Sequence, residues 1–596
     1  MKIRLKTDLN GDFRVVEVKA GITLEELCAE FKNELLYDIY IAKVNNQYKS
    51  LTYRLEDVSC EDDGDAPADL TAPEAAGSED CGSDHGTAVS DAETIPGSEL
   101  TSVELLDIRT QFAWNVYQEG LSMVFITAVN QVLARKRIEI ANSLNQGLYT
   151  EIDGMHPVPE NVIKQIRARM EELILRDLPF VREEKPRAQL LEELEGMGGV
   201  DSTIALIKQM TQAETLYSYS LDGHTQLSYE VMVPSTGYIR CFEIRRYKSG
   251  ILLRFPNMYS AAMLPPYINQ RNLYNEFSNQ TEWDQIVGVN YVADLNEKVE
   301  DGSYKELILI SEALKEKRIS DIADLITASG SRIILIAGPS SSGKTTFARR
   351  LAVQLRVNGL HSLCLSTDDY FVERDQTPLD ENGKVNYEGF DVLDRDLFCN
   401  NMNDLLEGRV VDLPEFDFIN GTKIFGRRPT RIGDNDLIII EGIHGLNEKL
   451  TEKIPHREKY KIYISPLTQL NVDEHHRVPT TDERLLRRLV RDYQFRGRSA
   501  AQTLDQWPLV RVGEDKNIFP YSDEADVLFN SYHVYEIAVL KKYAEPLLEE
   551  VTADNPAYAE AQRILDFLKF FKTIEDDSVI VNNSIIREVI GGSIFV

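Results

Sequence analysis

The chain has 596 residues, enough for three or four domains, and its 43% hydrophobic and 27% charged residues are typical of globular proteins. A formal net charge of −32 argues against broad electrostatic attraction to nucleic acid or to an anionic membrane. Six scattered cysteines without a C-x-x-C pair, and the absence of an apolar leader or a membrane-length apolar run, predict a cytoplasmic protein without membrane partners.

Residues 1–58 are expected to form a small β-rich unit. Residues 2–6 and 13–18 alternate between polar and apolar side chains, which predicts a β-hairpin. Thr23 then begins a helix, and Glu26 three residues later completes a capping box. This order of hairpin and helix resembles the β-grasp (TGS) domain at the amino terminus of threonyl-tRNA synthetases.

Residues 59–100 are expected to be an acidic, disordered linker. From residue 61 to 100 the chain carries 12 Asp and Glu side chains, no Lys or Arg, and almost no large apolar residue. Such a segment cannot bury enough apolar surface to offset the entropy of ordering it. Cys81 and His85 lie in this linker without the further ligands that a metal site needs.

Residues 101–268 are expected to form an α+β domain. Residues 121–133 and 159–175 have the composition and spacing of buried or amphipathic helices, and strand-like alternation follows at 239–245 and 250–255. The segment resembles the second amino-terminal domain of threonyl-tRNA synthetases, which is used for editing. That domain carries an H-x-x-x-H pair, whereas the comparable stretch here, 142–147, has no histidine. We therefore expect a relative in fold that lacks the editing chemistry.

A helical connector is expected over 269–330, with Ile319, Ile322, Leu325 and Ile326 on one face. It leads into a kinase-like domain at 331–548, and a helical tail is expected at 549–596. The key motif lies near the start of that domain.

The motif Gly338-Pro339-Ser340-Ser341-Ser342-Gly343-Lys344-Thr345 has the spacing G-x-x-x-x-G-K-[ST] of a phosphate-binding loop. An apolar run at 333–336 precedes it as a buried strand would, and 347–355 follows with helical spacing. In such a loop the backbone N–H groups surround the β-phosphate, the lysine reaches the β- and γ-phosphates, and the Thr345 hydroxyl faces Mg²⁺. The sequence therefore predicts ATP and Mg²⁺ as cofactors.

Two acidic residues follow apolar runs of the kind that form parallel strands. Asp368 comes directly after 363–366, and Glu441 comes directly after 437–440. The carboxyl ends of parallel strands form the crevice where α/β sheets bind ligands. Asp368 could there deprotonate a substrate hydroxyl, and Glu441 could hold Mg²⁺.

An arginine cluster lies further along this otherwise acidic chain. Arg484, Arg488 and Arg491 are spaced to share one helix face, and Arg496 and Arg498 follow. Guanidinium groups stabilise the charge of a transferring phosphoryl group. A solvated basic face is the alternative interpretation.

Residues 331–548 resemble the uridine kinase / phosphoribulokinase family. The matching segments are the phosphate loop, Asp368 to Phe371, Leu413 to Phe418, Ile440 to Ile443, and Arg487 to Asp492 with Arg496-Gly-Arg498. The resemblance implies catalytic roles for Asp368, Lys344, Arg488 and Arg491, ATP binding by Gly338 to Thr346 with Arg496 and Arg498, substrate binding by Asp368, Tyr370, Glu388, Phe416, Arg488 and Arg491, and metal binding by Thr345 and Glu441.

Two departures from the family pattern bear on the substrate. Glu388 stands where the family places a ribose-binding aspartate, and the histidine expected a few residues past Phe416 is missing. Discrimination between bases depends on buried polar groups, so the missing histidine leaves the base preference open. The resemblance favours uridine and cytidine without fixing either.

The predicted fold is multidomain: an α/β phosphate-loop kinase domain with a parallel sheet, preceded by a β-grasp domain and an α+β synthetase-like domain. The predicted function is ATP-dependent phosphorylation of a nucleoside 5′-hydroxyl. One alternative is a kinase for another alcohol, such as a sugar phosphate. A second is an RNA-linked regulatory ATPase whose amino-terminal half binds tRNA. Whether the chain forms a homo-oligomer stays open.

Overall fold

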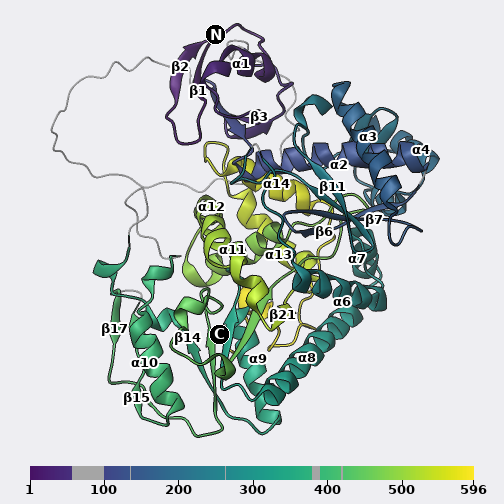
Figure 1. Ribbon diagram of the computed structural model, residues 1–596. Coiled ribbons are helices and arrows are strands. Elements are labelled where there is room, and N and C mark those ends of the chain that lie inside the picture. The colour runs from purple at the N-terminus through teal and green to yellow at the C-terminus, as the bar shows by residue number, and fades with distance from the viewer. Residues whose placement is uncertain (57–99, 135, 262, 379–388, 418–419, 596) are drawn as a thin grey trace, which may run out of the picture.

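The computed structural model describes residues 1–56, 100–134, 136–261, 263–378, 389–417 and 420–595. Along the chain it forms an amino-terminal sheet, an α+β unit, a helical segment and a larger α/β unit built on a parallel sheet (Figure 1). None of the helices in these ranges is long and apolar enough to cross a membrane. The predicted linker at 59–100 lies almost wholly outside them.

The first sheet has the strand order β2-β1-β5-β3-β4 and takes its middle strand from beyond the acidic segment. Its elements are β1 (Lys2–Lys6), β2 (Arg14–Glu17), α1 (Leu24–Glu30), β3 (Ile39–Val44), β4 (Gln47–Lys49) and β5 (Ser102–Asp107). The predicted hairpin and the Thr23–Glu26 capping box are confirmed. Strand β5 pairs with both β1 and β3, so the sheet extends past the expected boundary at residue 58.

The second unit has two antiparallel sheets and two hydrophobic cores: α2 and α3 pack in the larger core, whereas α4 and α5 pack with β9 and β10 in a smaller one. Its elements are α2 (Gln111–Leu133), β6 (Ile138–Leu144), β7 (Gly147–Ile152), α3 (Glu160–Leu175), β8 (Val181–Pro186), α4 (Arg187–Met197), α5 (Asp201–Gln209), β9 (Thr215–Leu221), β10 (His224–Leu227), β11 (Glu243–Tyr247) and β12 (Gly250–Arg254). The helix predicted at 159–175 is confirmed as α3. The helix predicted from Leu121 begins earlier, because the Thr110 side chain caps α2 by accepting from the Ala113 N–H.

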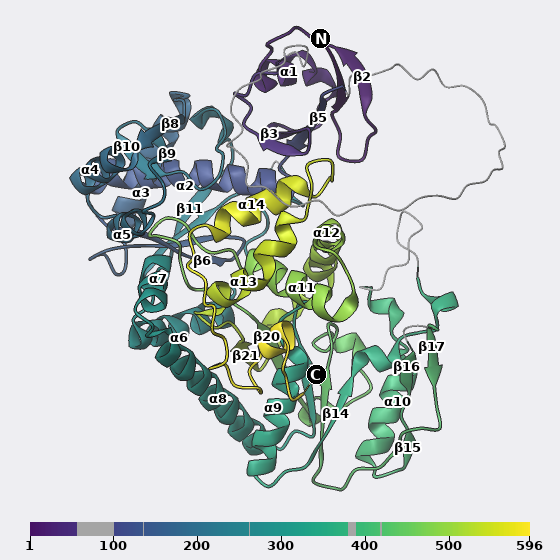
Figure 2. The same ribbon diagram turned by 180° about the vertical axis from the view of Figure 1, so that it is seen from behind.

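Three helices connect this unit to the parallel sheet: α6 (Arg271–Val287), α7 (Val292–Glu300) and α8 (Tyr304–Ser329). Helix α8 runs beside α9 in both views (Figures 1 and 2). Ile319, Ile322 and Ile326 are buried there as predicted, but Leu325 is 50% exposed because it lies at the flank of that face.

The parallel sheet has the order β14-β19-β13-β20-β21, and every pairing in it is parallel. Its strands are β13 (Ile333–Ala337), β14 (Ser362–Ser366), β19 (Leu437–Glu441), β20 (Lys459–Ser465) and β21 (Val527–Asn530). Alternate residues of β13 enter different cores. Ile334 packs toward α8 and α9, whereas Leu335 packs toward α10 on the other face. The predicted parallel sheet is confirmed.

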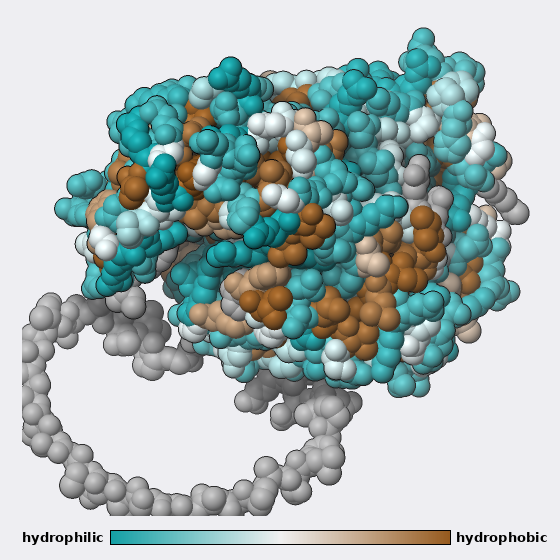
Figure 3. All heavy atoms as spheres, turned by 90° about the horizontal axis from the view of Figure 1, so that it is seen from below, coloured by the Kyte–Doolittle hydropathy of each residue, from teal (hydrophilic) through white to brown (hydrophobic). Residues whose placement is uncertain are grey.

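Further elements cover this sheet and extend beyond it. They are α9 (Lys344–Val357), α10 (Arg395–Leu406), the short strands β15 (Val411–Asp412), β16 (Glu415–Asp417), β17 (Thr422–Ile424) and β18 (Pro429–Thr430), and the helices α11 (Thr480–Arg496), α12 (Ala500–Asn517), α13 (Glu536–Glu549), α14 (Tyr558–Leu568) and α15 (Arg587–Ile590). Figure 3 shows mostly hydrophilic side chains on one face, with hydrophobic ones gathered in separate patches.

Candidate active site

The phosphate loop connects β13 to α9, as the motif predicts. Gly338 has no room for a side chain, since a Cβ would overlap the carbonyl oxygen of Ile464. Gly343 has a φ of +81°, in the left-handed region that favours glycine, and it immediately precedes α9. The loop therefore directs backbone N–H groups and the amino end of α9 toward one point, which is the arrangement that binds phosphate.

Lys344, Asp368 and Glu441 come together around this loop. The Lys344 Nζ donates to the carbonyl oxygens of Gly338 and Pro339, at 3.0 and 3.1 Å. Asp368 lies in a short 3-10 helix that directly follows β14, and Glu441 ends β19, where it is paired in register with Ser366. The three side chains are close enough to shift one another's pKa values.

The pKa shifts at these residues have one main cause, which is desolvation in the cleft. Desolvation raises the pKa of Glu441 to about 7, with a further rise from Asp368 and an opposing effect from Lys344. Desolvation also raises the pKa of Asp368. Its side chain is exposed at the mouth of the cleft, so this desolvation comes from the protein that surrounds it. The pKa of Lys344 is lowered.

Two arginines of α11 donate hydrogen bonds to backbone carbonyl oxygens of the phosphate loop. Arg484 donates to the carbonyl oxygen of Ser340, and Arg487 donates to that of Ser341, each at 3.2 Å. Both side chains are buried: Arg484 pairs with Glu514, and Arg487 pairs with Glu483 and Glu536. These two arginines therefore position the loop.

The arginines predicted to grip phosphates gather around the buried Asp492. Arg491 Nη2 donates to Asp492 at 2.8 Å, and Arg488 also donates to the Ser340 hydroxyl at 2.9 Å. The Asp492 carboxylate lies 3.6 Å from Arg496 and 4.0 Å from Arg498. The sequence pattern did not indicate that Asp492 pairs with these four arginines.

Phe416 and Tyr370, two of the predicted substrate-binding residues, lie in different surroundings. Phe416 packs edge-on against Phe371, with ring centroids 5.7 Å apart, beside a small cavity of about 60 Å³. Tyr370 is a core residue instead: its ring packs on Phe398, and its hydroxyl lies 3.4 Å from Asn401 Nδ2. Burial raises the pKa of Tyr370 to about 12. Glu388 lies outside the described residues.

The carboxyl-terminal segment, residues 580–595, packs onto the phosphate loop, which the sequence did not predict. The Glu588 carboxylate accepts from the Thr346 N–H at 3.1 Å and from the Thr346 hydroxyl at 2.6 Å. A Cβ on Gly343 would overlap the Ile585 side chain. On the other side of the loop, Glu514 accepts from the Ser340 N–H at 3.0 Å. Three donors of the phosphate site therefore already have carboxylate partners.

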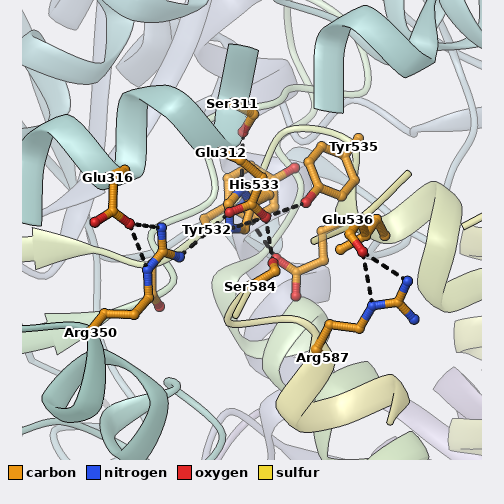
Figure 4. Close-up of polar contacts among 12 residues, drawn as sticks. Ser311, Glu312, Glu316, Arg350, Tyr532, His533, Tyr535, Glu536, Ser584 and Arg587 are labelled. Atoms are coloured by element: carbon orange, nitrogen blue, oxygen red, sulfur yellow. Dashed lines mark hydrogen bonds and ion pairs between the residues drawn. The ribbon is translucent and has the colours of Figure 1, made fainter. Parts of the chain in front are cut away.

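A buried polar cluster anchors this segment (Figure 4). The Ser584 hydroxyl donates to Glu312 of α8, and the Tyr535 hydroxyl donates to the same carboxylate at 2.9 Å. His533 is hydrogen-bonded to Ser311 at 3.0 Å, and Arg350 of α9 pairs with Glu316 at 2.5 Å. The cluster joins α8, α9 and α13 to the chain just before Glu588.

The sequence pattern of the phosphoribulokinase / uridine kinase family matches residues 333–538. A uridine kinase of Macrococcus caseolyticus is 31% identical over 198 residues, which cover 33% of this chain and 86% of that enzyme. A uridine kinase of Mycoplasma genitalium is 30% identical over 218 residues, covering 35% of this chain and 92% of that enzyme. The chain belongs to the phosphoribulokinase / uridine kinase family.

Among solved structures, a possible uridine kinase from Bacillus stearothermophilus is 23% identical, covers 36% of this chain and 97% of that chain, and has a TM-score of 0.24. Family membership makes residues 333–538 a kinase domain, and a kinase uses ATP as its phosphoryl donor. The synthetase-like resemblance of the amino-terminal half stays a prediction.

Within the described residues no three His, Cys, Asp or Glu side chains gather as a ready metal site. The donor set nevertheless suits Mg²⁺, which prefers a few oxygen ligands and retains several waters. The Glu441 and Asp368 carboxylates are close enough for repulsion to raise a pKa, and a divalent cation would relieve that repulsion. The Thr345 hydroxyl, in the first turn of α9, would complete the protein ligands.

Proposed function

We propose that this protein transfers the γ-phosphoryl group of ATP to the 5′-hydroxyl of a nucleoside, with uridine and cytidine favoured. The observation that carries the proposal is the meeting of Asp368, Lys344 and Glu441 at the phosphate loop of a kinase domain. The acceptor side supports a nucleoside rather than a sugar phosphate. Phe416 and Phe371 offer flat apolar surfaces on which a base could pack.

Asp368 acts as the general base in this proposal. It takes the proton from the 5′-hydroxyl as that oxygen forms a bond to the γ-phosphorus, while the bond to the β,γ-bridging oxygen breaks and ADP leaves. The raised pKa of Asp368 suits a base that must accept a proton and release it again. Lys344 turns from the Gly338 and Pro339 carbonyl oxygens toward the phosphates.

The arginines supply positive charge, and a metal ion would add to it. Arg488 and Arg491 lie on the phosphate-loop side of α11, where they counter the charge on the transferring group, and Arg496 is close enough to Asp368 to favour its ionised form. Arg498 joins them through Asp492. Mg²⁺ held by Thr345 and Glu441 would neutralise phosphate charge.

An acceptor screen tests the proposal. Purified protein with Mg²⁺-ATP is given uridine, cytidine, inosine, adenosine, guanosine, thymidine or ribulose 5-phosphate, and ADP release is measured. We expect turnover on uridine or cytidine. Turnover on ribulose 5-phosphate alone would identify the acceptor as a sugar phosphate instead of a nucleoside. ATP binding without turnover on any acceptor would favour the RNA-linked ATPase.

A further inference from the structure

A cavity of about 490 Å³ lies where the second unit meets the kinase domain. Its walls come from α2, α12, α14 and the segment between β20 and α11. Trp114, Tyr229 and Phe570 supply flat apolar surfaces. The phosphate loop, Asp368 and Glu441 are not among its lining residues, so this cavity is separate from the candidate active site.

Arg477 lines this cavity without an acidic partner. Its guanidinium makes no hydrogen bond or ion pair with any residue that the structure describes, and desolvation alone lowers its pKa to about 10. Arg563, in the same wall, is different, since it pairs with Asp482 at 2.8 Å and with Glu560 at 2.7 Å. The Arg477 side chain is half-buried, and a charge that is largely enclosed by protein without an acidic partner is destabilising. An acidic group from outside the chain would compensate Arg477.

Five carboxylates also line the cavity, those of Glu119, Glu230, Asp482, Asp515 and Asp523. Four of them already face a cation of the same wall: Asp482 and Glu230 lie 2.8 and 3.6 Å from Arg563, Asp515 lies 3.7 Å from Arg511, and Glu119 lies 3.5 Å from His476. Arg477 is therefore left for an anion from outside the chain.

Helix α11 begins at Thr480, three residues after Arg477, and no side chain caps its amino end. Thr480 and Thr481 line the same cavity, where the backbone N–H groups of the helix end carry partial positive charge. Asp482 and Glu483, in the same first turn, are already paired with Arg563 and Arg487. Glu230 Oε1 lies 3.6 Å from Arg563, whereas its buried Oε2 has no partner among the described residues. Desolvation raises the pKa of Glu230 to about 7 against the opposing effect of Arg563. When protonated, Glu230 can donate a hydrogen bond.

We propose that this cavity binds a small organic oxyanion, a carboxylate or a phosphate attached to a flat ring, with Arg477 as its anchor. The planar guanidinium matches both groups with two parallel N–H donors. The aromatic wall accepts the ring, because Trp, Tyr and Phe faces pack on flat groups. The site does not use the phosphoryl-transfer residues, so a protein carrying Asp368→Asn should bind the same ligand.

Equilibrium dialysis with defined probes tests the site. The probes are uridine 5′-monophosphate, inorganic phosphate and each of the twenty amino acids, and their separate arms distinguish a phosphate from a carboxylate source. We expect at least one probe to bind, Arg477→Gln to weaken that binding tenfold or more, and Arg477→Lys to retain part of it. Arg457→Gln is the control, since the Arg457 side chain is 85% exposed, and it should change nothing.

Thermal unfolding without probe separates a ligand-binding arginine from a structural one. Removing an uncompensated charge should leave the unfolding temperature of Arg477→Gln unchanged or higher, whereas Arg563→Gln should lower it by breaking buried ion pairs. A drop in Arg477→Gln comparable with that in Arg563→Gln would overturn the proposal. So would the failure of every probe to bind the wild-type protein, or undiminished binding by Arg477→Gln.

The contact of Glu588 with Thr346 carries a second inference, independent of that cavity. The N–H groups at the amino end of a helix favour anions, and in this fold they are the donors offered to phosphates. Glu588 takes the Thr346 N–H, and the buried Ser584 and Ile585 hold the segment in place. We infer that Glu588 competes with the phosphates of ATP for the amino end of α9, and that ATP binding displaces its carboxylate.

Calorimetric titration with Mg²⁺ and a non-hydrolysable ATP analogue tests this inference. Glu588→Gln keeps the size of the side chain and removes its charge, so we expect five- to tenfold tighter binding. Glu575→Gln, at an exposed position of the same region, is the control and should bind as the wild type does. Unchanged or weaker binding by Glu588→Gln would overturn the inference.

This inference rests on the proposed ATP site, and Lys344→Gln separates the two. If Lys344→Gln binds the analogue as tightly as the wild-type protein, the phosphate loop is not the site and both ideas fail. If Lys344→Gln loses binding while Glu588→Gln behaves as the wild type, only the competition fails.

Discussion

Glu441 and Asp368 lie side by side at the carboxyl ends of two neighbouring parallel strands. The register pairs Ser366 with Glu441, and Asp368 follows Ser366 by two residues. The Asp368 charge contributes to the raised pKa of Glu441, and Lys344 acts on both carboxylates in the opposite direction. In the proposed mechanism, Asp368 would serve as the base while Glu441 would hold the cation.

The first prediction concerns Asp368 as the general base. Asp368→Asn keeps the shape of the side chain but cannot accept the proton, so turnover should fall about 10²- to 10⁴-fold. Binding of an ATP analogue should remain within a few-fold of the wild type. Asp375→Asn, at an exposed position of the following segment, is the matched control and should keep full activity. Full turnover by Asp368→Asn would rule out the assigned role.

The second prediction concerns the pH dependence that Glu441 introduces. Its carboxyl must lose a proton to bind Mg²⁺, so below the pKa of about 7 the apparent Mg²⁺ affinity should fall about tenfold per pH unit. Titration of Mg²⁺ between pH 6 and 8 by calorimetry measures this slope. Glu441→Gln should bind Mg²⁺ weakly and without the slope. A slope that persists in this variant would point to another group.

The same shift has a consequence for folding stability without metal. When the pKa of a carboxyl is higher in the folded than in the unfolded protein, its ionised form opposes folding. The free energy of unfolding therefore falls as pH rises from about 4.5 to about 7. Glu441→Gln removes this contribution. We expect the variant to be more stable than the wild type at pH 8 and nearly equal to it at pH 4.5, as measured by urea unfolding.

The phosphate loop, its flanking strand and helix, and the acids at the ends of β14 and β19 were predictable because their signals are local. An apolar run marks a buried strand, and parallel strands bring their carboxyl ends to one edge. The contact of Glu588 with Thr346 has no local signal, since these residues are 242 positions apart. The sequence also could not show that Tyr370, expected at the substrate, is buried against Phe398, because a single aromatic residue beside Asp369 has no periodicity that would indicate the core.

A further prediction concerns the buried ion pairs that Arg487 makes next to the phosphate loop. Burial acts to lower the pKa of Arg487, but Glu483 and Glu536 outweigh it and hold the guanidinium charged. Arg487→Met leaves two buried carboxylates without their cation, which should cost about 3–5 kcal/mol of unfolding free energy. Lys516→Gln, at an exposed position of α12, should change it by less than about 0.5 kcal/mol. A small loss in Arg487→Met would show that the carboxylates become protonated without penalty.

The last prediction concerns Asp473, which joins the kinase domain to the second unit. Its carboxylate accepts from the Tyr229 hydroxyl at 2.7 Å and from the Thr203 hydroxyl at 2.9 Å, and it contacts His476 at 2.8 Å. Burial acts to lower the pKa of His476, but Asp473, with smaller effects from Glu119 and Glu230, outweighs it and the pKa is raised. The stabilisation from this pair is therefore complete below pH 6.5 and is lost as pH rises through the raised pKa.

Asp473→Asn should remove that pH dependence and weaken the junction. Because a buried charge loses its partner, we expect a loss of about 3–5 kcal/mol near pH 6, becoming smaller toward pH 9 as His476 is neutral in both proteins. Thermal unfolding at several pH values measures it, with Asp566→Asn on the exposed side of α14 as control. If the two units unfold in one transition in the wild type, the variant should separate them into two. A loss that is the same at every pH would mean that His476 does not titrate against Asp473.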